Sequence, residues 1–428
     1  MNENPLWAQV ADALPLQVSA QPLRAPIQQR RRRGYQRLPG SGQECVQLVR
    51  QDDALRWLYL PAATSGAGQR RAWRPDAAER RNVVSSFGVP MGSNQITLGL
   101  QQLDARLNPQ SGLYVWQDHW RPVQPDALAA LRGRVLVLLH GTFSKAGMFD
   151  AELTATPQGQ ALFKRLTAPG EPYAAVLAFE HPTLSVSPWI NALALGKLLQ
   201  PLEGVSLDLL CHSRGGLVAA WALQLTALPV AQVVFVGSPL AGTSLAAPDK
   251  LRHALDLLAN AADAMARMAG GLSLALPLAT GVVGLAAICG RVLGLGARMP
   301  LADAAVGLVP GLMAQSLVAN NLELAALDLH RTRAELKGIG VSFRPDALNE
   351  PLWKFWARLQ DMGGQLAYGA AGMVFDGDND LVVDTASMRS LPGCHIMWTD
   401  LPESGKTHHC NYFRDEQVIA YLGSQLLG

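Results

Sequence analysis

A single serine stands where a strand is expected to turn sharply into a helix. The segment Cys211–Gly216 reads Cys-His-Ser-Arg-Gly-Gly; it follows the apolar run Val205–Leu210 and precedes the alanine-rich run Leu217–Leu225. This layout is typical of a nucleophile elbow, in which a turn raises one hydroxyl above the end of a parallel sheet. The first N–H groups of the following helix then point toward developing negative charge. The structural alternative is a serine that only caps the helix.

Small residues flank this serine. Gly215 lies two positions after Ser213, where a side chain would crowd the turn. Cys211 lies two positions before it, where such motifs usually carry glycine. Because cysteine is small, we expect the turn to form.

From Arg134 onward, apolar runs alternate with segments of helical spacing. Four of the runs suit strands that are buried on both faces, and each ends in a polar cluster. These runs are Val135–Leu139, Ala174–Phe179, Val233–Val236 and Gly372–Phe375. The alternation predicts an α/β fold with a mostly parallel, doubly wound sheet. Sites in such sheets form beyond the carboxyl ends of the strands, so we expect the polar clusters to meet at one edge.

Four motifs occur in the order found in α/β-hydrolase-fold lipases and esterases, which the chain resembles from about residue 130 to residue 428. The motifs are His140–Thr142, Cys211–Gly216, Asn379–Val383 and His409–Phe413. The resemblance implies an α/β-hydrolase fold with the order serine, acid, histidine. It implies that Ser213 is the nucleophile, His409 the general base and Asp380 the carboxylate that orients the imidazole. It implies chemistry that needs no cofactor.

The resemblance also implies an oxyanion hole, which needs two N–H donors where negative charge develops. Arg214, directly after the nucleophile, is expected to supply one donor. The loop after the first buried strand is expected to supply the other, from Thr142 in preference to Phe143.

The acid has two rivals in its own turn. Asp376 and Asp378 precede Asp380, but only Asp380 is followed by the Leu-Val-Val that resembles lipase sequences. The Asp-x-Asp-x-Asp pattern also suggests calcium, although Leu381 and Ser387 replace the glycine and glutamate of an EF-hand loop and exclude that motif. A looser calcium site stays open, and no metal is predicted.

Several histidines compete for the role of base. His408 adjoins His409, and the family spacing to the residues that follow favours His409. His140 and His212 are expected to support loop structure, and His181 to be a structural histidine at a strand end rather than a residue that lines the site.

The chain divides into regions that differ in composition and hydrophobic pattern. Residues 1–43 are predicted to be a poorly ordered basic leader, and residues 44–130 a β-rich N-terminal extension, either a small subdomain or the opening hairpins of the main sheet. Residues 131–428 are predicted to form the hydrolase domain, with 244–325 as an apolar helical cap or lid. Strands are expected in the extension at Cys45–Val49, Leu55–Leu60, Ile96–Leu100 and Leu113–Trp116.

Residues 268–290 of the expected cap form a stretch of 23 positions without Asp, Glu, Lys or Arg. That length is enough to span a bilayer. Pro277 and five glycines argue against a span. We expect buried cap helices, with lipid contact and a true transmembrane segment as the alternatives.

Composition limits the partners of the chain. With 428 residues, 49% of them hydrophobic, it can bury a large core, and its net charge is +2. Arginine gathers near the start, as in Arg30–Arg33, either as solvated loop charge or for peripheral contact with an anionic membrane. No aromatic-interleaved motif accompanies this charge, so no nucleic-acid partner is expected. Five cysteines without paired spacing and the lack of a signal-like start favour free thiols and a cytoplasmic location.

These features predict a serine hydrolase that cleaves carboxylic esters through an acyl-enzyme intermediate. The apolar insertion favours a lipase-like or phospholipase-like enzyme with a hydrophobic acyl substrate over an esterase for small soluble esters. The alternatives are an inert hydrolase-like scaffold that associates with membranes, and an amidase, peptidase or acyltransferase that uses the same triad.

Overall fold

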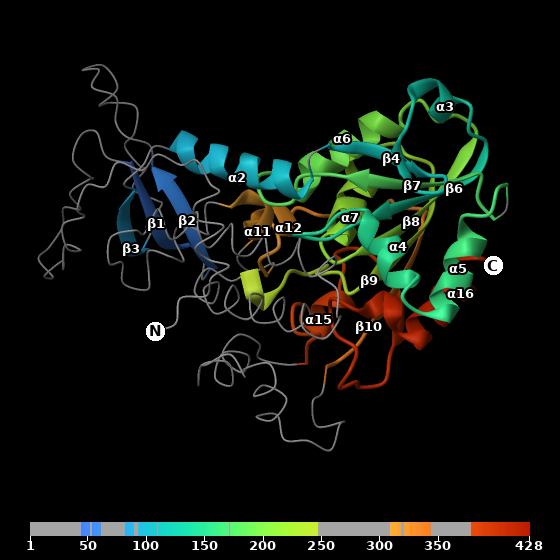
Figure 1. Ribbon diagram of the computed structural model, residues 1–428. Coiled ribbons are helices and arrows are strands. Elements are labelled where there is room, and N and C mark those ends of the chain that lie inside the picture. Colours follow the sequence, from blue (N-terminus) through green and yellow to red (C-terminus); the bar gives the residue numbers. More distant parts are fainter. Residues whose placement is uncertain are drawn as a thin grey trace, which may run out of the picture.

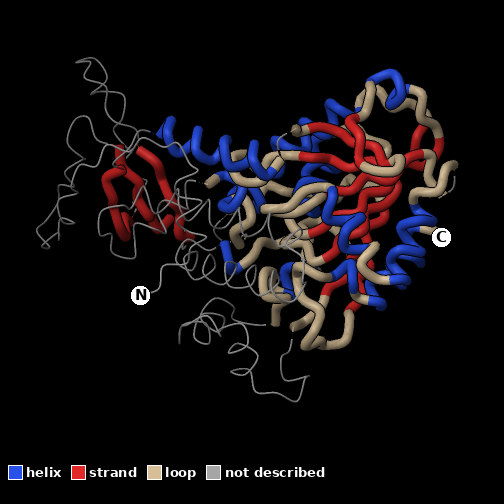
Figure 2. The backbone as a smooth tube through the Cα atoms, in the orientation of Figure 1, coloured by secondary structure: helices blue, strands red, loops and turns tan. Residues whose placement is uncertain are grey.

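The described part of the chain contains one large sheet and one small sheet (Figures 1 and 2). The computed structural model describes residues 44–51, 54–60, 82–89, 93–108, 110–170, 172–246, 309–317, 321–343 and 378–428. The small sheet has the order β2-β1-β3 and is antiparallel. Its strands are β1 (Glu44–Gln51), β2 (Ala54–Leu60) and β3 (Asn82–Val89).

The large sheet has eight strands in the order β11-β10-β9-β8-β6-β7-β4-β5. Six of them are parallel: β6 (Gly133–Leu139), β7 (Ala175–Glu180), β8 (Val205–His212), β9 (Val230–Val236), β10 (Glu335–Gly340) and β11 (Met397–Asp400). Two antiparallel strands, β4 (Gly112–Trp116) and β5 (Trp120–Pro122), close one edge. This mostly parallel sheet with β8 near its centre has the α/β-hydrolase fold, and the predicted fold class is confirmed.

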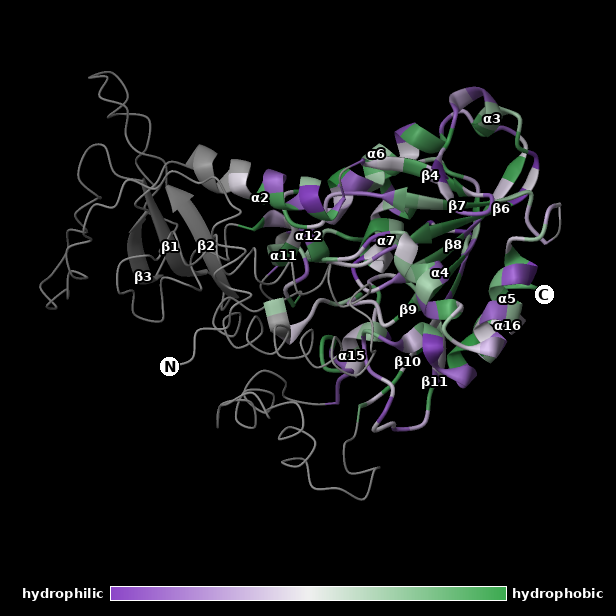
Figure 3. Ribbon diagram, in the orientation of Figure 1, coloured by the Kyte–Doolittle hydropathy of each residue, from purple (hydrophilic) through white to green (hydrophobic). Residues whose placement is uncertain are grey.

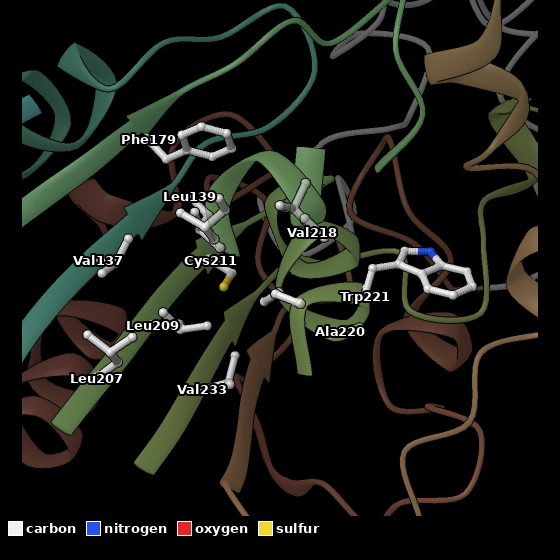
Figure 4. Packing of buried hydrophobic residues seen from close by; sticks show 14 of the residues in the cluster. Val137, Leu139, Phe179, Leu207, Leu209, Cys211, Val218, Ala220, Trp221 and Val233 are labelled. Atoms are coloured by element: carbon white, nitrogen blue, oxygen red, sulfur yellow. The ribbon is translucent and has the colours of Figure 1, made fainter. Parts of the chain in front are cut away.

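Helices cover both faces of the large sheet because its central strands are apolar on both sides (Figure 3). One face packs against α6 (Pro188–Leu199) and α7 (Gly215–Leu225), and Figure 4 shows Leu209 and Cys211 of β8 packed beneath Val218 of α7. The other face packs against α4 (Gly147–Leu153), α5 (Pro157–Leu166) and α16 (Glu416–Leu426). Alternate residues of β6, β8 and β9 therefore enter two separate cores.

The remaining helices lie around this body. They are α2 (Ser93–Leu107), α3 (Pro125–Ala129), α11 (Pro310–Met313), α12 (Leu322–Ala325) and α15 (Thr385–Met388), with 3₁₀ turns at Ser244–Ala246 and Tyr412–Arg414. In Figure 1, α2 runs between the small sheet and the main body.

Residues 44–130 differ in part from the expected β-rich extension. The strands expected at Cys45–Val49 and Leu55–Leu60 are present, and Leu113–Trp116 belongs to the large sheet. The strand expected at Ile96–Leu100 is wrong, because this run lies within α2. Leu100, Leu103 and Leu107 are buried at helical spacing, a pattern that a short apolar run does not reveal by itself.

Several expectations fall outside the described residues: the basic leader 1–43, the strand at Gly372–Phe375, and most of the cap, including the charge-free stretch 268–290. None of the helices in the described part of the chain has the length and apolar character needed to cross a bilayer.

Candidate active site

Ser213 sits in a tight turn between β8 and α7. Its backbone has φ 53°, a left-handed conformation that costs a non-glycine residue energy and is held by its surroundings. Ser213 N–H donates to the Val236 carbonyl at 3.0 Å, which ties the turn to β9. A side chain at Gly215 would place its Cβ 2.1 Å from the Leu139 carbonyl oxygen, so only glycine fits two positions after the serine.

The position two residues before Ser213 is occupied by the fully buried Cys211. Its small side chain lies in the core under α7 (Figure 4). Burial raises the pKa of this thiol. Cys211 is therefore a packing residue of the elbow strand.

Asp380 and His409 meet beside this turn. His409 Nδ1 donates to Asp380 Oδ2 at 2.8 Å, and the His409 N–H donates to the Asp380 carbonyl at 3.0 Å. A carboxylate accepts only, so this contact puts the proton on Nδ1 and leaves Nε2 of a neutral imidazole as an acceptor. Both residues are buried, Asp380 completely.

The Asp380 carboxylate is held from every side. Oδ1 accepts from the N–H groups of Val382 at 3.0 Å and Val383 at 2.8 Å. Oδ2 also accepts from the Tyr412 hydroxyl at 2.9 Å, and that hydroxyl accepts the Val341 N–H at 3.1 Å. These donors fix the orientation of the carboxylate.

His212 connects His409 to the elbow. Its Nε2 lies 2.9 Å from the His409 carbonyl, and the two imidazole rings have centroids 4.9 Å apart. Burial lowers the pKa of His212 to about 3, so the ring is neutral and donates this hydrogen bond. His409 is thus held next to the residue that precedes Ser213. Among the hydrogen bonds of the described residues, none joins the Ser213 hydroxyl to the imidazole.

The other candidates for the acid and the base do not take part in the contact between Asp380 and His409. Asp378 is exposed on the surface, and Asp376 lies outside the described residues. His408 Nδ1 accepts the Cys410 N–H at 3.3 Å, and burial lowers its pKa to about 4. His409, not His408, contacts Asp380.

Two further histidines, directly after β6 and β7, stack on each other. The ring centroids of His140 and His181 are 4.1 Å apart. His181 is completely buried, with Nδ1 3.0 Å from the Phe179 carbonyl, and burial lowers its pKa well below the ordinary value. Both rings are packed as supports of the strand ends.

The loop after β6 carries the two expected oxyanion candidates. Phe143 has φ 57°, and its N–H donates to Thr183 Oγ1 at 3.3 Å. The Thr142 hydroxyl pairs with the side-chain amide of Gln315, with Nε2 at 3.0 Å. A side-chain hydroxyl thus engages the Phe143 N–H, whereas no hydrogen bond between described residues uses the Thr142 N–H.

Arg214 follows the serine and is the N-cap residue of α7. Its guanidinium is completely buried, and Nη2 donates to the Val186 carbonyl at 2.6 Å, whereas Nε and Nη1 have no hydrogen-bond partner among the described residues. Burial lowers its pKa to about 10, an effect that Asp104 and Glu323 oppose. The sequence singled out only its backbone N–H, and a hydrophilic residue in a turn carries no signal of this burial.

The residues of the described segments contain no group of three or more His, Cys, Asp or Glu side chains arranged to hold a metal ion.

A family model described as "Domain of unknown function (DUF7379)" matches residues 107–427. No curated protein sequence matches the chain.

Solved structures similar to the chain share little of its sequence. The mature lipase BlEst2 from Bacillus licheniformis is 17% identical, with 68% of this chain and 91% of that chain covered and a TM-score of 0.36. A hydrolase from Pseudomonas aeruginosa is 14% identical, with 69% and 90% covered and a TM-score of 0.39. MenH from S. aureus is 15% identical, with 74% and 98% covered and a TM-score of 0.34.

Proposed function

Because this chain belongs to the DUF7379 family, whose description gives no activity, we propose its function from the site: it hydrolyses carboxylic esters through an acyl-enzyme intermediate on Ser213. The observation that carries this proposal is the 2.8 Å contact of His409 Nδ1 with Asp380, beside the turn that holds Ser213. Free serine hydrolases often have a long contact between serine and histidine that shortens when substrate binds.

The proposed reaction has two halves. In the first, His409 Nε2 takes the hydroxyl proton while Ser213 Oγ attacks the carbonyl carbon of the ester. The resulting oxyanion collapses, the bond to the alcohol oxygen breaks, and the alcohol leaves with the proton from His409. In the second half, His409 takes a proton from water, the hydroxide attacks the acyl-serine, and the acid leaves as Ser213 regains its proton.

Asp380 gives the histidine its role in both halves. It keeps the proton of the neutral ring on Nδ1 and stabilises the imidazolium that forms during each attack. Four donors hold the carboxylate in place, so it does not need to reorganise when the ring becomes charged.

The oxyanion is proposed to bind the N–H groups of Thr142 and Arg214. Each donor of this kind contributes about 3–4 kcal/mol of transition-state stabilisation. The left-handed turn at Ser213 and the start of α7 set the direction of the Arg214 N–H. Phe143 is the weaker candidate because its N–H already has a partner.

The substrate is proposed to have a hydrophobic acyl group. The insertion leaves the main body after β9 and returns at residues 309–317, where Gln315 contacts Thr142. The returning end of this apolar insertion therefore adjoins the proposed oxyanion loop. Apolar surface at a site favours acyl chains over small polar esters.

A labelled fluorophosphonate probe and two p-nitrophenyl esters test the proposal. We expect the probe to label the wild type and not Ser213→Ala. The control variant Ser206→Ala, on the same strand β8, should label as the wild type does. Hydrolysis of the laurate ester should exceed that of the butyrate ester.

Equal labelling of wild type and Ser213→Ala would overturn the serine mechanism. No labelling of a folded wild type would favour the inert scaffold instead. Labelling with cleavage of anilides but not esters would assign an amidase, and a preference for butyrate would remove the hydrophobic substrate only.

A further inference from the structure

A buried carboxylate on α2 holds the loop between β7 and α6. Asp104 is 3% exposed. Its Oδ1 accepts the N–H groups of Thr183 at 2.8 Å and Leu184 at 3.0 Å, and its Oδ2 accepts the N–H of Ser185 at 2.6 Å and its hydroxyl at 2.5 Å. Three consecutive backbone donors thus point at one carboxylate, which fixes the path of this loop.

The same loop supports the oxyanion loop. Thr183 is completely buried, and its Oγ1 accepts the Phe143 N–H at 3.3 Å. This hydrogen bond sets the orientation of the peptide between Thr142 and Phe143. The proposed donor, the Thr142 N–H, belongs to the peptide directly before it. The two peptides share the Thr142 Cα, so the hydrogen bond restricts the Thr142 torsions on which the direction of the donor depends.

The elbow contacts this loop from the other side. Arg214 Nη2 donates to the Val186 carbonyl at 2.6 Å, three residues after Thr183. On the side of α2, Asn108, the first residue after this helix, donates to the His181 carbonyl at 3.0 Å. The loop therefore lies between α2 and the nucleophile turn, with polar contacts to both.

We propose that Asp104 is a positioning residue for the oxyanion hole: it holds Thr183 where the threonine hydroxyl fixes the Phe143 N–H and thereby orients the Thr142 N–H. This inference rests on the proposed esterase function. Under this proposal, α2 contributes a residue on which the reaction rate depends. Asp104 lies outside residues 107–427, which the family model matches, so the family alone would not point to it.

The test compares steady-state hydrolysis of p-nitrophenyl butyrate by five variants of the full chain. Asp104→Asn keeps the shape of the side chain but replaces an acceptor oxygen with a donor. Thr183→Val removes the hydroxyl, and Thr183→Ser keeps it. The fourth variant combines Asp104→Asn with Thr183→Val.

The fifth variant, Asp208→Asn, is the matched control. Asp208 is also a buried carboxylate, 1% exposed, and its Oδ2 accepts from Arg134, Tyr173 and Gln232, each at 2.8 Å. It lies within β8, on the face that packs against α16, and touches no residue of the proposed site.

We expect kcat to fall about tenfold in Asp104→Asn and in Thr183→Val with KM changed less than about twofold, because a misplaced donor affects only the transition state. Thr183→Ser should keep most of the wild-type kcat. The double variant should be little worse than either single variant, since both act through one hydrogen bond. Asp208→Asn should keep the wild-type kcat while its thermal midpoint falls.

Wild-type kcat in Asp104→Asn, or losses that multiply in the double variant, would overturn the positioning role. So would equal damage from Thr183→Ser and Thr183→Val, a pair that decides the question even if Asp104→Asn does not fold. A folded wild type that hydrolyses no ester would overturn the proposed function and this inference with it. An active wild type with an unaffected Asp104→Asn overturns the inference alone.

Discussion

Two buried carboxylates, one within a central strand and one in a turn at the carboxyl edge of the sheet, differ in the hydrogen-bond partners that surround them. Asp208, within β8, accepts from the Arg134 guanidinium, the Tyr173 hydroxyl and the Gln232 amide. Asp380, at the carboxyl edge, accepts from two backbone N–H groups, a tyrosine hydroxyl and the His409 imidazole.

The difference lies in whether a partner takes part in proton transfer. The donors of Asp208 keep their protons at neutral pH, and burial beside this carboxylate raises the pKa of Tyr173 further. Asp380 contacts the His409 imidazole, which takes up and releases a proton in the proposed reaction. Under that proposal the first carboxylate stabilises the fold, whereas the second supports proton transfer.

The largest expected effect is a loss of activity when Asp380 is replaced. Asp380→Asn should lower kcat on an ester on the order of 10⁴-fold, because the amide favours the wrong imidazole tautomer. Steady-state hydrolysis measures this loss, and circular dichroism checks the fold. A variant that keeps a tenth of the wild-type kcat would show that Asp380 is not the orienting acid.

The corresponding substitution at Asp208 should lower stability and leave activity unchanged. Asp208→Asn weakens three hydrogen bonds, one of them to a guanidinium that is partly exposed, and should lower the free energy of unfolding by about 2 kcal/mol. Urea denaturation monitored by tryptophan fluorescence measures the change. A fall in kcat comparable to that of Asp380→Asn would remove the contrast between the two carboxylates.

Lowering the pH should destabilise the folded protein because of the buried His212. Burial lowers its pKa to about 3 from the ordinary value of 6.5, so below pH 6.5 the unfolded chain binds a proton that the folded chain does not. This contribution to stability is complete above pH 6.5 and is lost as the pH falls toward 3, at up to about 1.4 kcal/mol per pH unit.

Urea midpoints at pH 7, 6 and 5 measure that slope. His212→Gln retains a side-chain donor for the His409 carbonyl but does not titrate, so its slope should be shallower than that of the wild type. Parallel slopes would mean that His212 is protonated in the folded protein.

The smallest expected effect concerns the support of Asp380. Tyr412→Phe removes one of four donors and leaves the buried Val341 N–H without its acceptor, at a cost of about 1 kcal/mol in stability. We expect kcat to fall by only a few fold, because three donors still hold the carboxylate. A loss as large as that of Asp380→Asn would make the tyrosine indispensable to the acid.

Local signals in the sequence predict the sheet and the elbow well. β6, β7 and β9 contain continuous apolar runs, and β8 is largely apolar, because these strands are buried on both faces. Gly215 follows from the crowding at Leu139. The contact of Asp380 with His409 agrees with the residues that the lipase resemblance indicated.

Other features depend on contacts between distant parts of the chain. Asp104 lies among the leucines of α2, and nothing nearby in sequence indicates that its partners are 79 to 81 residues away. The burial of the Arg214 side chain is equally invisible, because charged residues are almost always exposed unless paired. The wrong strand at Ile96–Leu100 arose because five apolar-rich positions suit either a strand or a helix.

The two ends of the insertion are fastened together at the main body. Thr243 N–H donates to the Gln315 carbonyl at 2.8 Å, and Thr243 pairs with Ser316 in a short parallel bridge. Since the ends meet here, doubling the number of residues between them would cost only about 0.6 kcal/mol in loop-closure entropy. At this junction, segments of other lengths can therefore replace the insertion while the sheet is left intact.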